Sequence, residues 1–355
     1  MTVLVGTTED SGMDRYSREI ARFLPVEVAY ISRYRSGLRA LRLVRKLVAQ
    51  HGAIHFSNQH FGRYALITRC PYIVTVHDLV RLCFPFSREN PKEAIRLKFD
   101  TLGIKRASHI VAVSHNTKRD MVTRLGIPEH RITVIHNGVN HGVFKPGSSR
   151  PFPFPYLLYV GSERPRKNLS RLLSAFAQLK RGGDFPDLKL IKVGKPGRSV
   201  KFRRNTLRTI EELGLGDEVL LVEDIGDEEL ATYYSSASAL VYPSLYEGFG
   251  LPVVEAMACH CPVVTSNVSS LLEVAGDASI LVDPQDVDGL HLAMARLLTD
   301  AELREQLVAK GREHARKFSW YETAMATLDV YKRVQAGADQ RTGYIRSSGA
   351  CTLER

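Results

Sequence analysis

The sequence has no apolar run close to the roughly 18 to 20 residues that a membrane-spanning helix needs. Its beginning, Met1–Gly6, lacks the basic and then apolar pattern of a signal peptide. We therefore expect a cytoplasmic protein. Any contact with the cell membrane would be peripheral, at its inner face. The five cysteines have neither zinc-site nor disulfide spacing. No Gly-x-Gly-x-x-Gly follows an expected strand, which disfavours a Rossmann dehydrogenase.

Acidic residues are scarce in the first part of the chain. Residues 1–147 contain 23 Lys and Arg against 11 Asp and Glu, whereas residues 148–355 contain 26 against 27. The local excess of positive charge favours an anionic partner, either nucleic acid or an anionic membrane surface. There is no recognised nucleic-acid motif, and aromatic residues do not interleave with the basic ones. We expect no nucleic acid partner, and a basic binding module is the non-enzymatic alternative.

Short apolar runs alternate with helical patterns along the chain, as in parallel sheets built from strand-helix units. A length of 355 residues suits two such domains. The expected strands are 2–6, 26–31, 53–57, 72–77, 109–114 and 132–136 in the first half, and 156–161, 188–194, 218–223, 239–244, 262–266 and 279–282 in the second.

A proline-rich connector, Lys145–Pro155, separates two doubly wound α/β domains at 1–147 and 148–319. Helical patterns follow at 287–298, 301–318 and 320–334. The tail, 336–355, is poor in large apolar residues and rich in Gly, Ser, Thr and Arg, so we expect it to be mobile.

The segment from Glu247 to Glu255 connects an apolar run to a helical pattern, so it is a strand-to-helix loop at the carboxyl end of a parallel sheet. Gly248 and Gly250 allow the backbone to approach a ligand closely. The start of the following helix favours phosphate, and the two carboxylates can accept hydrogen bonds from hydroxyl groups. These features suit a ligand that contains both phosphate and sugar.

A second loop, Tyr159–Asn168, joins another expected strand to a helix and places Arg164, Arg166 and Lys167 at the same edge of the sheet. Cations at that edge can neutralise a departing diphosphate. Arg164 has no assigned role and is interpreted as a solvated loop arginine.

The Glu-x7-Glu pattern filled by Gly-Phe-Gly-Leu-Pro resembles the signature of the retaining glycosyltransferases of family 4, over about residues 10 to 335. The resemblance implies the GT-B fold, with two Rossmann-like domains facing a central cleft. It also implies that a C-terminal helix at about 320–335 returns to the first domain. Arg166 and Lys167 would hold the diphosphate, and Glu255 the ribose hydroxyls. The implied donor-binding residues are Gly12, Gly161, Arg166, Lys167, Gly248, Phe249, Gly250, Leu251 and Glu255.

Three residues are the implied catalytic ones: Glu247, which would contact the donor sugar, His77 and Asp78. The last two end the expected strand in Tyr72–Leu79, and a histidine that ends a strand is often only a structural residue. The N-terminal loop departs from the family, because Ser11–Tyr16 has Asp14 where many relatives have glycine. An anion beside a diphosphate is unfavourable unless it is paired.

The resemblance is to bacterial mannosyltransferases of surface polysaccharides, so the expected reaction moves mannose from GDP-mannose to a glycan or lipid-linked glycan. We expect no metal and no other cofactor. Retention could arise through a covalent Glu247 intermediate or through same-face substitution, which we favour. A nucleotide-sugar 2-epimerase of the same fold is the enzymatic alternative.

The stretch Arg33–Lys46 has six basic residues and no acidic one, interleaved with apolar residues at helical spacing. That pattern is typical of a helix on an anionic membrane surface. It is equally compatible with a helix that packs on the sheet and leaves its arginines in water.

Overall fold

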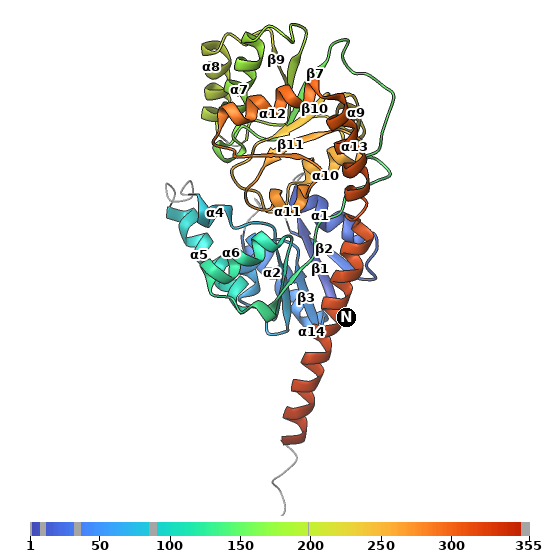
Figure 1. The fold of residues 1–355 in the computed structure, drawn as a ribbon. Helices are drawn as coiled ribbons and strands as arrows, with labels where there is room; N and C mark the ends of the chain where they lie inside the picture. Colours follow the sequence, from blue (N-terminus) through green and yellow to red (C-terminus); the bar gives the residue numbers. More distant parts are fainter. Residues whose placement is uncertain (1, 8–11, 32–36, 85–90, 198, 349–355) are drawn as a thin grey trace, which may run out of the picture. The chain divides into compact units, whose positions relative to one another are not determined.

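The computed structural model describes residues 2–7, 12–31, 37–84, 91–197 and 199–348. The chain forms two compact units, the first from residues 1–138 and 320–355 and the second from residues 139–319. Each unit contains a six-stranded parallel sheet flanked by helices (Figure 1). The twelve strands expected from the sequence are all present, within two residues of their predicted ends.

The strands of the first sheet follow the order β2-β1-β3-β4-β5-β6, so the order reverses between β1 and β3. The middle strands are buried along their whole length, as expected for parallel strands with helices on both faces. The six strands are β1 Thr2–Thr7, β2 Glu27–Ile31, β3 Ala53–Phe56, β4 Tyr72–Val76, β5 His109–Ala112 and β6 Ile132–Val134. The longer helices of this unit are α1 Gly12–Ala21, α2 Gly37–Gln50, α5 Pro91–Arg106, α6 His115–Leu125 and α14 Trp320–Ser348, and the short ones are α3 Gly62–Ala65 and α4 Val80–Cys83.

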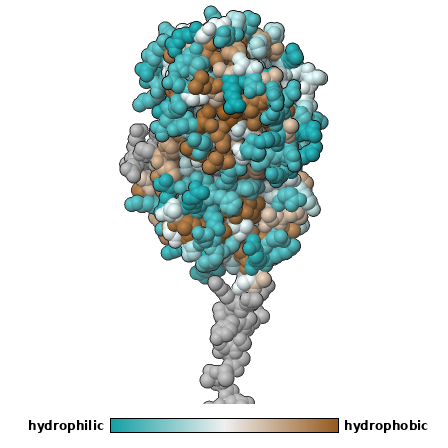
Figure 2. All heavy atoms as spheres, viewed as in Figure 1, coloured by the Kyte–Doolittle hydropathy of each residue, from teal (hydrophilic) through white to brown (hydrophobic). Residues whose placement is uncertain are grey.

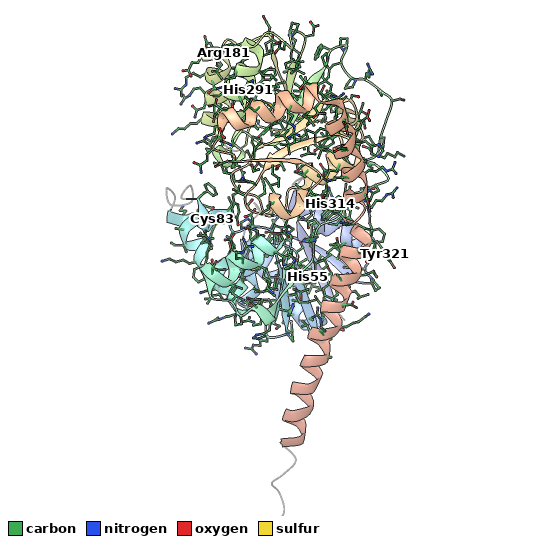
Figure 3. All side chains as sticks on the ribbon, in the orientation of Figure 1. His55, Cys83, Arg181, His291, His314 and Tyr321 are labelled. Atoms are coloured by element: carbon green, nitrogen blue, oxygen red, sulfur yellow. The ribbon has the colours of Figure 1, made fainter. Side chains whose placement is uncertain are left out.

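Helix α14 is held to the first sheet by a buried histidine (Figure 3). His55 Nδ1 lies 2.6 Å from the Tyr331 hydroxyl and its Nε2 lies 2.7 Å from Thr75 Oγ1. Burial lowers the pKa of His55 to about 3, so the ring is neutral and acts as a polar link. The helix continues to Ser348, beyond the predicted end near Val334, and residues 349–355 lie outside the described part. The mobility expected of residues 336–355 stays a prediction.

The second sheet has the order β12-β11-β10-β7-β8-β9, and its order reverses between β7 and β10. Ligands of open α/β sheets bind beyond the carboxyl ends of the strands at such a reversal. The strands are β7 Tyr156–Val160, β8 Lys189–Val193, β9 Val219–Val222, β10 Ala239–Tyr242, β11 Val263–Ser266 and β12 Ile280–Val282. The helices are α7 Leu169–Arg181, α8 Val200–Glu212, α9 Asp227–Ser236, α10 Leu251–Ala258, α11 Leu271–Ala275, α12 Val287–Thr299 and α13 Ala301–Ala315, with a 3-10 turn at Pro165–Lys167.

Helix α2 uses its apolar side for packing. Ala40, Val44 and Leu47 are buried in the core of the first unit. This burial favours the alternative in which the helix packs on the sheet, although Leu38 of the apolar stripe is exposed. Membrane contact through Arg33–Lys46 stays a prediction, and residues 33–36 lie outside the described part. The visible surface is mostly hydrophilic, with hydrophobic residues reaching it in patches (Figure 2). In the described part of the chain, none of the helices is long and apolar enough to cross a membrane.

Candidate active site

The two loops singled out in the second half of the sequence follow β7 and β10, which are neighbours in the sheet. Backbone and side-chain hydrogen bonds join the loops. The Leu245 N–H donates to the Arg166 carbonyl at 2.8 Å. The buried Asn168 side chain donates to the carbonyl of Pro243 at 2.9 Å and to that of Pro284 at 2.6 Å. Side chains from both loops are thus held at one edge of the sheet.

Glu247 is the centre of an ion-pair cluster. Its Oε1 lies 2.7 Å from Lys167 Nζ, and its Oε2 lies 2.9 Å from Arg166 Nη1. The Tyr242 hydroxyl donates to Oε1 at 3.0 Å, and Lys167 Nζ also contacts that hydroxyl. The structure therefore brings together two adjacent cations of one loop and a carboxylate of the other loop that follows them about 80 positions later in the chain.

The ionisation of the cluster follows from its burial and its charges. Burial alone would raise the pKa of Glu247, but the adjacent Arg166 and Lys167 outweigh it and lower the pKa to about 2. Burial lowers the pKa of Lys167 to about 8, although Glu247 opposes the shift. Both groups are therefore mainly charged at neutral pH, and Lys167 is the one that titrates just above it.

The backbone before α10 is arranged around glycine. Gly250 has a φ of 108°, and a Cβ at this position would lie 2.6 Å from Leu271 Cδ2, so another side chain would not fit without movement. Ser270 Oγ lies 2.9 Å from the carbonyls of both Glu247 and Phe249, which fixes the turn. The predicted ligand-binding stretch Gly248–Leu251 thus leads directly into the first turn of α10.

Glu255 lies in α10 and is almost fully buried. The Tyr234 hydroxyl donates to its Oε2 at 3.1 Å. Gly161, the remaining predicted residue of this unit, follows β7 directly, and its N–H donates to the Val193 carbonyl at 2.8 Å. Both residues therefore belong to the strand ends and helix that carry the Glu247 cluster.

A second charge cluster was missed by sequence reasoning. Lys192, in the buried strand β8, pairs with the fully buried side chain of Glu163 at 2.9 Å. Arg203 contacts the same Glu163 oxygen at 2.6 Å and also pairs with Glu223. Burial would raise the pKa of Glu163, but Arg203 and Lys192 together lower it. Glu163 lies within the Tyr159–Asn168 loop, directly before Arg164, so this cluster anchors the first part of that loop. The sequence did contain one sign of this cluster, because Lys192 lies within a mainly apolar strand and a buried lysine needs an acidic partner.

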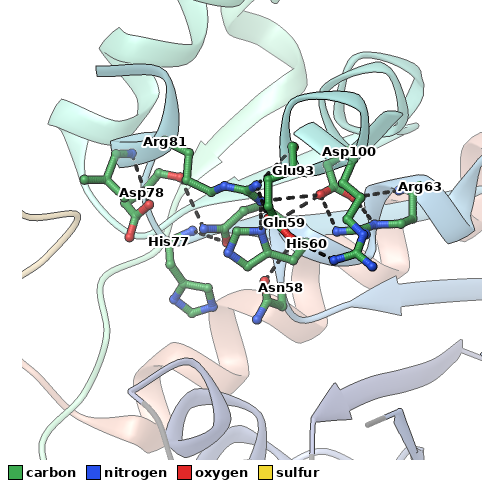
Figure 4. Close-up of polar contacts among 11 residues, drawn as sticks. Asn58, Gln59, His60, Arg63, His77, Asp78, Arg81, Glu93 and Asp100 are labelled. Atoms are coloured by element: carbon green, nitrogen blue, oxygen red, sulfur yellow. Dashed lines mark hydrogen bonds and ion pairs between the residues drawn. The ribbon is translucent and has the colours of Figure 1, made fainter. Parts of the chain in front are cut away.

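His77 and Asp78 occupy the carboxyl end of β4 in the first unit, as predicted (Figure 4). His77 is buried, and its Nε2–H donates to the Ser57 carbonyl at 2.8 Å. Its backbone N–H donates to Gln59 Oε1 at 3.1 Å, and its ring packs edge-on against Tyr16. Asp78 Oδ1 accepts from the N–H of Val80, the first residue of the short helix α4, at 3.1 Å. The histidine ring is therefore held in one orientation.

Helix α1 begins at Gly12, and Asp14 is buried in its first turn. The positive end of the helix dipole favours a carboxylate at this position, which accounts for an anion in the N-terminal loop region. Ser17 Oγ donates to the Asp14 carbonyl at 3.0 Å. Ser11 lies outside the described residues.

Comparison with known proteins gives the family. The model "Glycosyltransferase Family 4" matches residues 1–143, and "Glycosyl transferases group 1" matches residues 145–314. The chain is 32% identical over 272 residues to the O-antigen chain mannosyltransferase B of Escherichia coli, covering 73% of this chain and 70% of that protein. The chain is a glycosyltransferase of family 4.

Other similar proteins have names that differ from that of the mannosyltransferase. This glycosyltransferase is 32% identical to the D-inositol 3-phosphate glycosyltransferase of a Nocardioides species, over 81% of this chain and 69% of that one. Its fold is similar to sucrose-phosphate synthase from Thermosynechococcus elongatus, with a TM-score of 0.78, 25% identity and coverage of 95% and 99% of the two chains. The α/β architecture is thus the GT-B fold that the sequence predicted.

Proposed function

We propose that this glycosyltransferase moves a hexose, with retention of configuration, from a nucleotide-diphosphate sugar to a glycan acceptor, and that GDP-mannose is its donor. The observation that carries the proposal is the cluster of Arg166, Lys167 and Glu247 at the carboxyl edge of the second sheet. The mannosyltransferase name of the Escherichia coli relative supports the choice of sugar.

The two cations of the cluster suit a diphosphate leaving group. As the bond between the sugar carbon and the phosphate oxygen breaks, its electron pair leaves with the nucleotide, and negative charge grows on the phosphate. Donors aimed at that charge stabilise the transition state more than the ground state. Buried charged groups act strongly there because little water screens them.

We infer that Glu247 has two successive partners. Without donor it neutralises Arg166 and Lys167; a diphosphate takes over part of that pairing, and the carboxylate then accepts hydrogen bonds from sugar hydroxyls. The cations that lower its pKa to about 2 also weaken it as a nucleophile. This supports same-face substitution, in which the acceptor oxygen bonds to the sugar carbon and its proton passes to the leaving phosphate. Mass spectrometry that traps a glycosylated Glu247 would contradict this assignment.

The remaining predicted residues take supporting roles. Glu255 would bind the ribose hydroxyls, and the amides of Phe249, Gly250 and Leu251 would approach the sugar and the phosphate. His77, held in orientation by Ser57, would position the reacting sugar. Gly12 opens α1 and would allow close approach of the substrates. We place the acceptor, a lipid-linked glycan, at the cytoplasmic face of the membrane.

We propose that the reaction needs no metal, because Arg166 and Lys167 supply the positive charge that a divalent ion supplies elsewhere. The test is a screen of nucleotide sugars for hydrolysis and transfer, each with and without a chelator. GDP-mannose should give the highest kcat/KM, unchanged by the chelator, and NMR should show a product of the donor's anomeric configuration. Loss of activity with chelator would refute the metal-independent mechanism, and release of a 2-epimerised sugar would identify an epimerase instead.

A further inference from the structure

Helix α5 of the first unit presents a ridge of apolar side chains to solvent. Ile95, Phe99 and Leu102 are 55%, 51% and 37% exposed. Their spacing of four and then three residues places them on one side of an α-helix, at about 100° of rotation per residue. Single exposed apolar residues are ordinary, but three aligned ones on one helix form a continuous surface.

Cations flank this ridge on both sides. By the helical rotation, Lys98 and Lys105 lie on one side of it and Lys92 and Arg96 on the other, while Arg106 continues the line of the ridge at the end of the helix. All five are exposed. Neither Lys98 nor Lys105 forms an ion pair with a carboxylate of the described residues. The ridge and these five cations are called the outer face of α5 below.

By the helical rotation, the acidic residues of α5 lie on the side opposite the ridge, where they meet Arg63 and Arg81 (Figure 4). Asp100 is buried and accepts two hydrogen bonds of 2.8 Å from the Arg63 guanidinium. Glu93 pairs with Arg81 at 2.6 Å and with Arg96 at 2.7 Å. Both acidic side chains of the helix are therefore neutralised by arginines, Asp100 in the interior and Glu93 beside the helix. The outer face keeps a net positive charge.

A groove of about 480 Å³ adjoins the ridge. Its lining combines apolar and cationic residues: Leu82, Leu97, Leu102, Arg81, Lys98 and Lys105. Long basic side chains can keep their charged ends in water while their stems lie along an apolar surface. This combination suits an amphiphile with an anionic head group.

We propose that the outer face of α5 docks the first unit on an anionic lipid bilayer. An apolar ridge between two rows of cations matches the boundary between acyl chains and anionic head groups. Nucleic acid would use the cations but would leave the ridge exposed to water. Helix α2, also basic, is less suited, because Leu38 is its one exposed large apolar residue while Val44 and Leu47 are buried. The inference does not depend on which sugar the enzyme transfers.

Flotation of the whole protein with lipid vesicles tests the proposal. The protein should bind phosphatidylcholine vesicles that contain phosphatidylglycerol and should not bind pure phosphatidylcholine. The ridge variant Ile95→Ser/Phe99→Ser should bind at least about tenfold more weakly, because it loses the inserted apolar surface. The variant Lys98→Gln/Lys105→Gln should lose about 25-fold, at about fivefold for each cation near anionic lipid.

Two matched variants act as controls. Leu292→Ser removes an apolar residue of the second unit that is 63% exposed, and it should bind as the wild type does. Arg42→Gln/Arg45→Gln removes two exposed cations from α2, and its loss should be clearly smaller than that of the α5 lysine pair. Wild-type binding by the ridge variant, or an α2 loss equal to the α5 loss, would overturn the proposal.

Insertion can be measured directly with Phe99→Trp in a Trp320→Phe background, since the chain has a single tryptophan. Emission should move to shorter wavelength with anionic vesicles, and unchanged emission would contradict insertion. A second copy of the chain is the other molecule that could cover this face, and light scattering tests for it. A wild-type dimer that the ridge variant converts to monomers would assign the face to a second copy and overturn the proposal. Donor hydrolysis without vesicles should be the same in the ridge variant and the wild type, which separates docking from the proposed catalysis.

Discussion

The two units hold their candidate residues by different forces. In the second unit, Glu247 is fixed by two cations and a tyrosine hydroxyl. In the first unit, His77 is fixed by the Ser57 carbonyl and the Gln59 side chain, which are neutral. The cations of such a cluster can exchange their carboxylate partner for a diphosphate, whereas neutral hydrogen bonds can only set an orientation. The difference fits our proposal that the second unit binds the charged leaving group and that the first positions the reacting sugar.

The largest effect should come from the buried charges that anchor the cationic loop. Lys192→Met leaves Glu163 in the interior with Arg203 as its remaining partner and should lower the free energy of unfolding by about 3 kcal/mol, the scale for a broken buried pair. Urea denaturation measures the loss. Lys310→Met, which breaks the exposed pair with Asp277, should change stability by less than about 1 kcal/mol. Equal losses of unfolding free energy in the two variants would show that the Glu163 cluster stabilises the protein no more than an exposed ion pair does.

The next effect concerns catalysis. Lys167→Ala removes a partly buried cation from the proposed diphosphate site and should lower kcat about 100-fold or more, as for a single donor to a developing oxyanion. Lys310→Ala should keep wild-type kcat. Steady-state assays with the preferred donor would disprove the role of Lys167 if both variants were equally active.

A smaller effect is expected in the first unit. His77→Ala should reduce kcat about tenfold through lost positioning, with the fold intact. The exposed His130→Ala is the control. If His77→Ala were as damaging as Lys167→Ala, the contrast between a binding unit and a positioning unit would be wrong.

The pH dependence should show the smallest change. Lys167 must be protonated to bind phosphate and has a pKa of about 8, lowered by burial, so kcat/KM of the free enzyme should be halved near pH 8 and fall further above it. Lys167→Arg should move this limb to higher pH, because guanidinium stays charged. If kcat/KM fell at the same pH in the wild type and in Lys167→Arg, the titrating group would be a residue other than Lys167.

The strands could be predicted because parallel strands covered on both faces appear as continuous apolar runs. The common edge for Lys167 and Glu247 was also predictable, since strand-to-helix loops share the carboxyl side of a sheet. Their direct contact was not, because it depends on which side chains of adjacent loops meet. The Glu163 cluster was not predicted for the same reason, because its four members come from separate segments: Glu163, Lys192, Arg203 and Glu223.

The two basic helices show another limit. Periodicity predicted an amphipathic helix near Arg33–Lys46. The sequence alone does not show whether the apolar side of such a helix packs on the core or faces solvent. In α2 the apolar side packs on the sheet, and in α5 three apolar residues remain outside. The positive charge of the outer face of α5 was not evident from the sequence, because the helix also contains Glu93 and Asp100. The structure shows that Arg81 and Arg63 neutralise these two residues.

The most direct test of the Lys167 and Glu247 cluster is calorimetric binding of a nucleoside diphosphate and the monophosphate of the same base, with chelator present. The wild type should prefer the diphosphate by at least about tenfold, the scale of one hydrogen bond to a charged group. Lys167→Ala should lose this preference, and Lys310→Ala should retain it. An unchanged preference in Lys167→Ala would contradict the assignment of the cluster to the diphosphate.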